Sequence, residues 1–247
     1  MLHLFAEPSA QQGELLTITG GDVNHIKNVL RMRPGEEISV SNGVDAREYR
    51  YGIEEIGEEQ ILLRLRFVKE ADTELPVCVT LFQGIPKADK MEWIVQKCVE
   101  LGVSEIVPVA MERCVVKLDE KKRGRRAERW QSIAEAAAKQ SRRGILPAVR
   151  EPMTMQEAVQ YAAAMEVKLL PYELAENTPG TRELIERIEP GSRVAVFIGP
   201  EGGFAPEEVR MAQEAGVLPV TLGRRILRTE TAGMTVLSWL IYTQEIR

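Results

Sequence analysis

Residues 197–204, FIGPEGGF, join an apolar run to a loop that consists almost entirely of backbone. The run from Val194 to Ile198 reads as a buried strand, and a helix-like stretch begins at Pro206. Glycine permits positive φ angles and close approach by a ligand, so this loop can bind a group through its amides and carbonyls. Glu201 would repel a phosphate but suits a cation or a hydrogen-bond donor. A tight strand-to-helix turn without a ligand is the alternative interpretation.

A second candidate loop is LGRRILRTETAG, residues 222–233, in which three arginines surround the apolar pair Ile226–Leu227. Thr229 is a natural N-cap for the final helix. Arginines beside a helix start oppose the helix dipole unless an anion lies there. A solvated loop is the alternative here. The patterns GxGxxG and GxxxxGK[ST] do not occur in the sequence, so a standard nucleotide site is not expected.

The segment 113–143 contains 11 basic and 4 acidic residues in a chain whose net charge is −5. Two arginine-rich blocks, KKRGRR and SRRG, bracket an alanine-rich helix in this segment. Such a local excess of positive charge suits phosphate groups, and a solvated helix face is the competing interpretation. Residues 1–72, in contrast, contain 8 basic and 13 acidic residues.

The elements that must position these loops change in type near residue 73. The first part of the chain is β-rich, with the hairpin signal Asn42–Gly43 and a short helix at 22–32 that Asp22 can cap. Further strands are expected at 15–20, 47–53 and 61–68, with a linker at 69–76. We therefore predict a small β-barrel or sandwich domain over residues 1–72.

From residue 77 onward, strands and helices alternate, which predicts an α/β domain over residues 73–247 with a mainly parallel sheet covered on both faces. In an open sheet of this kind, ligands bind beyond the carboxyl ends of the strands. The expected strands are 77–85, 105–110, 167–173, 193–199 and 220–223, and the expected helices include one at 125–142.

Composition narrows the class of protein. No run approaches eighteen apolar residues, so a membrane span is not expected, and the first residues do not read as a signal peptide. Cys78, Cys98 and Cys114 are odd in number and widely spaced, which argues against a disulfide scaffold and gives no metal-ligand spacing. A cytoplasmic location is the simplest expectation.

The chain resembles the RsmE-type family, which are 16S ribosomal RNA uridine-N3 methyltransferases of the SPOUT superfamily. The resemblance rests on KADKMEWIVQKCVELGVSEIVPV, EAAAKQSRRGILPAV, FIGPEGGF and LGRRILRTETA. HIKNVLRMRPGEEISVSNG also resembles the PUA-like RNA-binding domain of that family. The resemblance implies a deep trefoil knot at the C-terminal end of the sheet, a homodimer, S-adenosylmethionine as cofactor, no metal, and 16S ribosomal RNA within the small subunit as partner.

The reaction that the resemblance implies suggests roles for individual residues, which we state as hypotheses. Arg228 would stabilise negative charge on the uracil oxygens, and Glu201 and, further, Glu135 are candidate bases. The cofactor would be held by Leu170, Ile198, Gly199, Pro200, Gly202, Gly203, Leu222, Gly223, Ile226, Leu227 and Ala232. RNA would be held by His25, Arg31, Arg33, Lys87, Lys90, Arg125, Arg126, Arg142 and Arg143.

Two positions depart from the usual family pattern: Cys114 stands where serine is common, and Ala205 where a serine or threonine cap is common. Three alternatives stay open at this point. The acceptor could be a ribose 2′-hydroxyl, or the chain could be a non-catalytic RNA-binding assembly factor. A surface lysine or a capping histidine explains Lys87, Lys90 and His25 equally well without RNA.

Overall fold

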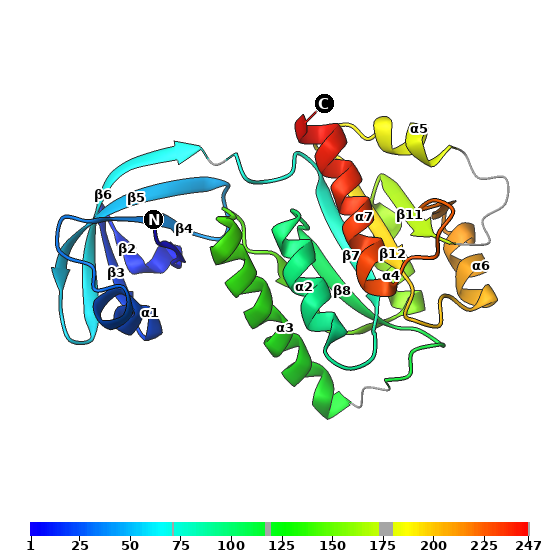
Figure 1. Ribbon diagram of the computed structural model, residues 1–247, viewed down its shortest axis with the longest axis horizontal. Helices are drawn as coiled ribbons and strands as arrows, with labels where there is room; N and C mark the ends of the chain where they lie inside the picture. The colour runs from blue at the N-terminus through cyan, green and yellow to red at the C-terminus, as the bar shows by residue number, and fades with distance from the viewer. Residues whose placement is uncertain (71, 117–119, 173–179, 247) are drawn as a thin grey trace. The chain divides into compact units, whose positions relative to one another are not determined.

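The computed structural model describes residues 1–70, 72–116, 120–172 and 180–246, and the side chains of 120–122 are not among those described. The chain divides into two compact units (Figure 1). Unit 1 consists of Met1–Glu74 together with Ala138–Leu146, and unit 2 consists of Leu75–Ala137 together with Pro147–Arg247. The sequence pattern places the division at 72/73 and does not anticipate that 138–146 lies in unit 1.

Unit 1 is built on a six-stranded sheet in the order β1-β4-β5-β6-β3-β2. Strand β1 runs parallel to β4, and every other neighbouring pair is antiparallel. This pairing gives an open row of strands from β1 to β2, so the closed ring of a β-barrel is not shown. The strands are β1 (His3–Phe5), β2 (Gln11–Gln12), β3 (Leu15–Thr19), β4 (Glu37–Ser41), β5 (Arg47–Ile56) and β6 (Gln60–Glu70).

One short helical segment covers the core of unit 1. It begins with α1 (Gly21–Asn24) and continues as the π-helical turn η2 (His25–Val29), while a 3₁₀ turn, η1 (Pro8–Ala10), precedes β2. Val23 and Ile26 of this segment are buried against strand residues such as Ile61 and Leu63. The expectation that Asp22 caps the helix is wrong, because Gly20 is the N-cap residue and no side chain bonds there. Asp22 instead lies 3.5 Å from the Nζ atom of Lys139.

A buried ion pair fastens the segment 138–146 to the rest of unit 1. The Arg143 guanidinium is 2.5 Å from Glu74 Oε2, and its side chain is only 3% exposed. Glu74 Oε1 also accepts hydrogen bonds from the main-chain N–H groups of Gly144 and Ile145. His3 adds a contact between its Nε2 atom and the Arg143 carbonyl. The prediction that Arg143 contacts RNA is therefore corrected, because its charge is satisfied inside the unit.

Unit 2 contains a seven-stranded sheet whose main path is β10-β8-β7-β12-β11-β13, with β9 paired to β8. All these pairs are parallel, as the alternating pattern predicts. The strands are β7 (Cys78–Gly84), β8 (Glu105–Ala110), β9 (Ala148–Val149), β10 (Met153–Thr154), β11 (Val167–Pro171), β12 (Arg193–Ile198) and β13 (Leu218–Val220).

Helices cover both faces of this sheet. Phe82 and Phe197, stacked with ring centroids 4.4 Å apart, share a core with α4 (Met155–Tyr161) and α6 (Pro206–Glu214). Leu81, the neighbour of Phe82, points to the opposite face and contacts Gly233 of α7 (Thr229–Ile241), which packs beside α2 (Lys90–Glu100) (Figure 1). The remaining helical segments are α3 (Glu120–Ser141), η3 (Ala162–Ala164), α5 (Thr181–Glu186) and η4 (Tyr242–Ile246).

The short elements β9, β10 and α4 are absent from the sequence-based prediction. A signal for α4 exists, because Thr154 and Glu157 form a reciprocal capping box at its start. The predicted strand 167–173 ends at residue 173, which lies outside the described residues, as do residues 117–119 of the basic segment.

Candidate functional site

The parallel strands β7, β11, β12 and β13 end at one edge of the unit 2 sheet, where both candidate loops begin. At this edge β7 and the GPEGG loop touch: a β-carbon on Gly84 would stand 2.6 Å from the nitrogen of Pro200. Within the loop, the Gly203 N–H donates to the Pro200 carbonyl at 2.9 Å. A β-carbon on Gly199 would stand 3.2 Å from the Gly203 backbone. The glycines therefore serve a compact turn wedged against a neighbouring strand.

Thr229 ties the second loop and α7 to the first loop. Its hydroxyl donates to the Gly199 carbonyl at 2.7 Å and accepts from Gln83 Nε2 at 2.8 Å. The prediction that Thr229 is the N-cap is wrong: Arg228 occupies that position with extended backbone, and Thr229 is the first helical residue. Thr229 is 7% exposed, and its hydroxyl bonds across the sheet edge instead of capping its own helix.

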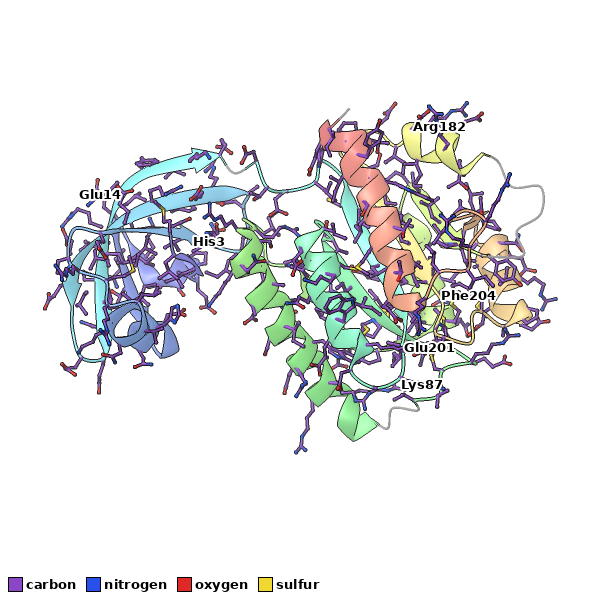
Figure 2. All side chains as sticks on the ribbon, in the orientation of Figure 1. His3, Glu14, Lys87, Arg182, Glu201 and Phe204 are labelled. Atoms are coloured by element: carbon purple, nitrogen blue, oxygen red, sulfur yellow. The ribbon has the colours of Figure 1, made fainter. Side chains whose placement is uncertain are left out.

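Glu201, at the tip of the GPEGG loop, connects this loop to the segment after β7 and to the start of α2. Its carboxylate accepts from the Lys87 main-chain N–H at 3.1 Å and lies 2.9 Å from Lys90 Nζ. Lys90 also lies 3.5 Å from Glu230 in the first turn of α7. Partial burial opposes ionisation of Glu201, but these bonds from Lys90 and Lys87 outweigh it and lower its pKa. Figure 2 shows Lys87, Glu201 and Phe204 gathered in this part of unit 2.

The arrangement places two carboxylates around one ammonium group. Glu230 Oε2 is buried and accepts no hydrogen bond from any described residue, although Lys90 lies within ion-pair distance. The bond to Glu201 raises the pKa of Lys90, so the lysine is charged at neutral pH. Together, the side chains of Glu201, Glu230 and Lys90 carry one net negative charge. This charge favours a cationic ligand over a phosphate.

The loop 111–114 holds the other side of the GPEGG loop. The Arg113 guanidinium donates to the Gly202 carbonyl at 3.0 Å. The thiol of Cys114 donates to the Val109 carbonyl and accepts from the Met111 N–H, and burial raises its pKa. Cysteine thus makes the bonds that a serine hydroxyl could make at this position.

Helix α6 is fixed to the same region through a carboxylate. Glu208 is 7% exposed and accepts from the main-chain N–H groups of Glu112 at 2.8 Å and Ala205 at 2.9 Å. Ala205 is the N-cap residue of α6, and its methyl group offers no acceptor to the helix N–H groups. Only half of a capping box is therefore present.

The second loop is far more open than the first. Ile226 is 83% exposed, and Gly223 adopts φ of +104° with open space where a side chain would be. Arg224, Arg225 and Arg228 are exposed as well. Thr221–Gly223 line a cavity of about 670 Å³ together with residues of α5 and the end of α7, namely Thr181, Arg182, Ile185, Glu186, Trp239, Tyr242 and Thr243.

The predicted cofactor residues fall into two groups. Leu170, Ile198 and Ala232 are buried in the core, so their side chains do not face open space. The remaining positions lie in the two loops: Gly199, Pro200, Gly202, Gly203, Leu222, Gly223, Ile226 and Leu227. Of these positions only Leu222 and Gly223 line the cavity, and no residue of the GPEGG loop is among its lining residues. The loops offer main chain and apolar side chains for a flat, uncharged ring, and the Glu201–Lys90–Glu230 cluster suits a cation.

The predicted RNA residues are distributed over both units. In unit 1, His25, Arg31, Arg33 and Arg142 are exposed, whereas Arg143 is buried. In unit 2, Lys87 and Arg125 are exposed, Arg126 is half-buried, and Lys90 is engaged with Glu201. Glu135, the further candidate base, is exposed on α3.

The sequence argument missed Gln83, Glu208 and Glu230. A signal for Gln83 exists, because it is the polar residue near the end of the apolar strand VCVTLFQGI and is fully buried. In the described ranges, no group of three or more His, Cys, Asp or Glu side chains is placed to hold a metal ion. Nor does that part of the chain contain a helix with the length and apolar character needed to cross a membrane.

Comparison with known proteins identifies both parts of the chain. The model of the RNA methyltransferase domain matches residues 73–241, and that of the RNA methyltransferase PUA domain matches residues 18–66. The ribosomal RNA small subunit methyltransferase E of Bacillus subtilis is 34% identical over 252 residues, which covers 100% of this chain and 98% of the relative.

Solved structures agree over nearly the whole length. The ribosomal RNA small subunit methyltransferase E of Neisseria gonorrhoeae, bound to S-adenosyl methionine, has a TM-score of 0.85 at 31% identity, covering 98% of this chain and 97% of that one. A putative methyltransferase of Legionella pneumophila with bound cofactor SAM has a TM-score of 0.82 at 36% identity, covering 97% and 96%. The resemblance drawn from the sequence motifs is confirmed, and the chain belongs to the RNA methyltransferase family.

Proposed function

We propose that this protein transfers a methyl group from S-adenosylmethionine to N3 of a uridine in 16S ribosomal RNA. The observation that carries the proposal is the joined pair of loops at the sheet edge, in which Thr229 bonds to Gly199 and the open second loop lies beside the GPEGG turn. Relatives that align with the whole chain are named as small-subunit ribosomal RNA methyltransferases, which supports the RNA substrate.

The residues of the two loops fit the cofactor. Gly203 and Gly223 have positive φ angles and open space at the β-carbon position, so a ligand can approach their main chain closely. Leu222, Ile226 and Leu227 supply apolar surface for an adenine ring. The excess carboxylate charge of Glu201 and Glu230 over Lys90 suits a sulfonium cation. When bound, the cofactor supplies an electrophilic methyl group.

Uracil N3 carries a proton at neutral pH, so the protein must assist its loss. Arg228 is exposed at the start of α7, where its guanidinium can stabilise negative charge that develops on the uracil oxygens. Glu201 stays ionised and is held by Lys87 and Lys90, which favours an ordering role for it over a role as base. N3 also lies on the pairing edge of the base, so the uridine must be unpaired before it reacts.

RNA positioning in unit 2 would come from the basic segment of α3. Arg125 and Arg126 occupy that helix without an ion pair to another described side chain. Lys90, in contrast, is neutralised by Glu201, so we propose it as a positioning residue for the GPEGG loop and not as a phosphate ligand.

Further features follow from the family resemblance. We propose that unit 1 is a PUA-like β-barrel RNA-binding domain and that the C-terminal part of unit 2 is a SPOUT-type trefoil knot. The expected domain division at 72/73, the homodimer, the cytoplasmic location and action within the small ribosomal subunit are proposed on the same ground.

The test is methyl transfer from S-adenosylmethionine to small-subunit RNA or particles, with the modified nucleoside identified by mass spectrometry. N3-methyluridine supports the proposal, whereas a 2′-O-methyl nucleoside indicates the ribose as acceptor. RNA binding without cofactor binding in a calorimetric titration would identify a non-catalytic assembly factor. Arg228→Ala should lower turnover at least a hundredfold while cofactor affinity is unchanged. Unchanged turnover in this variant removes Arg228 from the mechanism.

A further inference from the structure

Glu230, in the first turn of α7, is a largely buried carboxylate. Its side chain is 18% exposed, and its Oε2 atom is fully covered and accepts no hydrogen bond within the described part of the chain. The positive end of the helix dipole favours a carboxylate at this position and offsets part of the penalty of burial. Buried carboxylates normally accept hydrogen bonds or face a cation at close range. The position of Glu230 therefore requires an explanation beyond its own helix.

Lys90 forms an ion pair with Glu230, but Glu201 holds it more closely. The Nζ atom lies 2.9 Å from Glu201 Oε1 and 3.5 Å from Glu230 Oε2. Glu201 also accepts from the Lys87 main-chain N–H at 3.1 Å. Ala88, between the two lysines, adopts a left-handed φ of +52°, so the segment is bent where both donors reach the same carboxylate. Lys90 therefore neutralises Glu201, and the charge of Glu230 is left without an equal partner.

A second buried acceptor lies where α7 begins. Gln83 is fully buried, and its Nε2 atom donates to the Gly84 carbonyl at 2.9 Å and to the Thr229 hydroxyl at 2.8 Å. The single hydroxyl proton of Thr229 goes to the Gly199 carbonyl. These bonds fix the orientation of the amide, because the reverse orientation would place its oxygen against the Gly84 carbonyl. Gln83 Oε1 is left without a donor among the described residues, so acceptors outnumber donors at this junction.

The proposed reaction changes the charge on one atom of the cofactor. The S–CH₃ bond breaks with its electron pair left on sulfur, the N3–CH₃ bond forms, and the N3 proton leaves to a base or to water. The sulfonium of S-adenosylmethionine thereby becomes the neutral thioether of S-adenosylhomocysteine. The adenosine and amino acid parts carry the same charges in both molecules. A site with one unbalanced carboxylate therefore stabilises the substrate relative to the product.

We propose that Glu230 distinguishes S-adenosylmethionine from S-adenosylhomocysteine by the charge on sulfur, and that Lys90 sets the strength of this discrimination. Because Lys90 offsets one of the two carboxylates, only one unit of negative charge attracts the sulfonium. After methyl transfer this attraction is lost, which favours release of the product. The inference rests on the proposed function in taking S-adenosylmethionine as methyl donor, and it adds the residue that separates substrate from product.

The test is the ratio of two dissociation constants, Kd for S-adenosylhomocysteine over Kd for S-adenosylmethionine, from calorimetric titration of the full-length protein. A change in the order of the loops alters both constants alike, whereas a change in the charge that faces sulfur alters only the second. Glu230→Gln should lower the ratio about tenfold, since an opposite charge within about 4–6 Å shifts the balance between charged and uncharged forms by this amount or more. Glu230→Asp keeps the charge and should retain most of the ratio.

Lys90→Met should move the ratio in the opposite direction. Removal of the ammonium group leaves both carboxylates unbalanced, so the ratio should rise about threefold or more. Sinefungin, in which a charged amine on carbon replaces the sulfonium, should follow S-adenosylmethionine in both variants. That result would show that the charge is recognised and not the methyl group itself.

Glu245→Gln is the matched control. Glu245 lies in η4, at the other end of the helical run that begins with α7, and its side chain is exposed. Exposed charges farther away than the Debye length of about 8 Å are largely screened, so the ratio should stay within about 1.5-fold of the wild type.

Several results would overturn the inference. An unchanged ratio in Glu230→Gln, with or without a parallel loss of affinity for both compounds, would assign Glu230 to the stability of α7 and its loops alone. If urea unfolding shows that this variant does not fold, Lys90→Met decides, and a ratio at or below the wild-type value refutes the idea. In each case a wild-type enzyme that methylates RNA leaves the proposed function standing. Failure of the wild type to bind S-adenosylmethionine would remove both proposals.

Discussion

Thr229→Val removes one hydroxyl while it conserves the shape of the side chain at the junction of the two loops. Two short hydrogen bonds are lost, to the Gly199 carbonyl at 2.7 Å and from Gln83 Nε2 at 2.8 Å. Each intramolecular bond of this kind contributes about 1 kcal/mol net. The Gly199 carbonyl then lacks its hydroxyl partner in a crowded turn, whereas the Gln83 amide retains its bond to the Gly84 carbonyl.

An unsatisfied buried polar group adds about 1–3 kcal/mol to the loss. Together these effects predict that the free energy of unfolding falls by about 3–5 kcal/mol in Thr229→Val. The same substitution should weaken S-adenosylmethionine binding about tenfold or more, because the GPEGG loop is no longer fixed to α7. Urea unfolding measures the first effect, and calorimetric titration measures the second.

Thr235→Val is the matched control. Its hydroxyl bonds to the Thr231 carbonyl one turn earlier in the same helix, so its removal affects only α7 itself. We expect a loss of roughly 0.5 kcal/mol or less and unchanged cofactor affinity. A Thr229→Val protein that is as stable as this control, with normal cofactor affinity, would refute the idea that the hydroxyl holds the loops together.

Two further predictions concern groups outside the loops. Burial lowers the pKa of His3 below its usual 6.5, so the neutral ring is the folded form; its stabilising contribution is present above pH 6.5 and is lost as the pH falls below that value. His3→Gln should flatten the decline in urea midpoint between pH 7.5 and 5.5, and an equal decline in both proteins would contradict this. Ala205→Ser should add about 1 kcal/mol of stability by completing the cap of α6, and a midpoint equal to the wild type would show that the hydroxyl does not reach the helix N–H groups.

The features that follow from local sequence are predictable here because they depend on neighbouring residues. Strand and helix alternation indicates the parallel sheet of unit 2, and the Gly-Pro-Glu-Gly-Gly run indicates a tight turn at its edge. Thr229 shows the limit of such reasoning. Serine and threonine often cap helices, but this hydroxyl bonds to residues 30 and 146 positions away, which no local pattern contains.

Arg143 illustrates the same limit for charge. A run of basic residues predicts an exposed patch, yet this arginine is buried because Glu74 lies opposite it, 69 residues earlier in the chain. The strands β9 and β10 were missed for another reason. Each contains two residues and is defined by pairing with β8, so their own sequence carries almost no strand signal.

The return of residues 138–146 to unit 1 has a consequence for the order in which the protein matures. During synthesis, the first 74 residues are translated before Arg143. Glu74 and His3 therefore lack their contacts with Arg143 until that later segment has been made. The N-terminal unit can reach its final state only after α3 has been made. Anyone who wishes to isolate it as an RNA-binding fragment must therefore graft 138–146 onto the shorter piece.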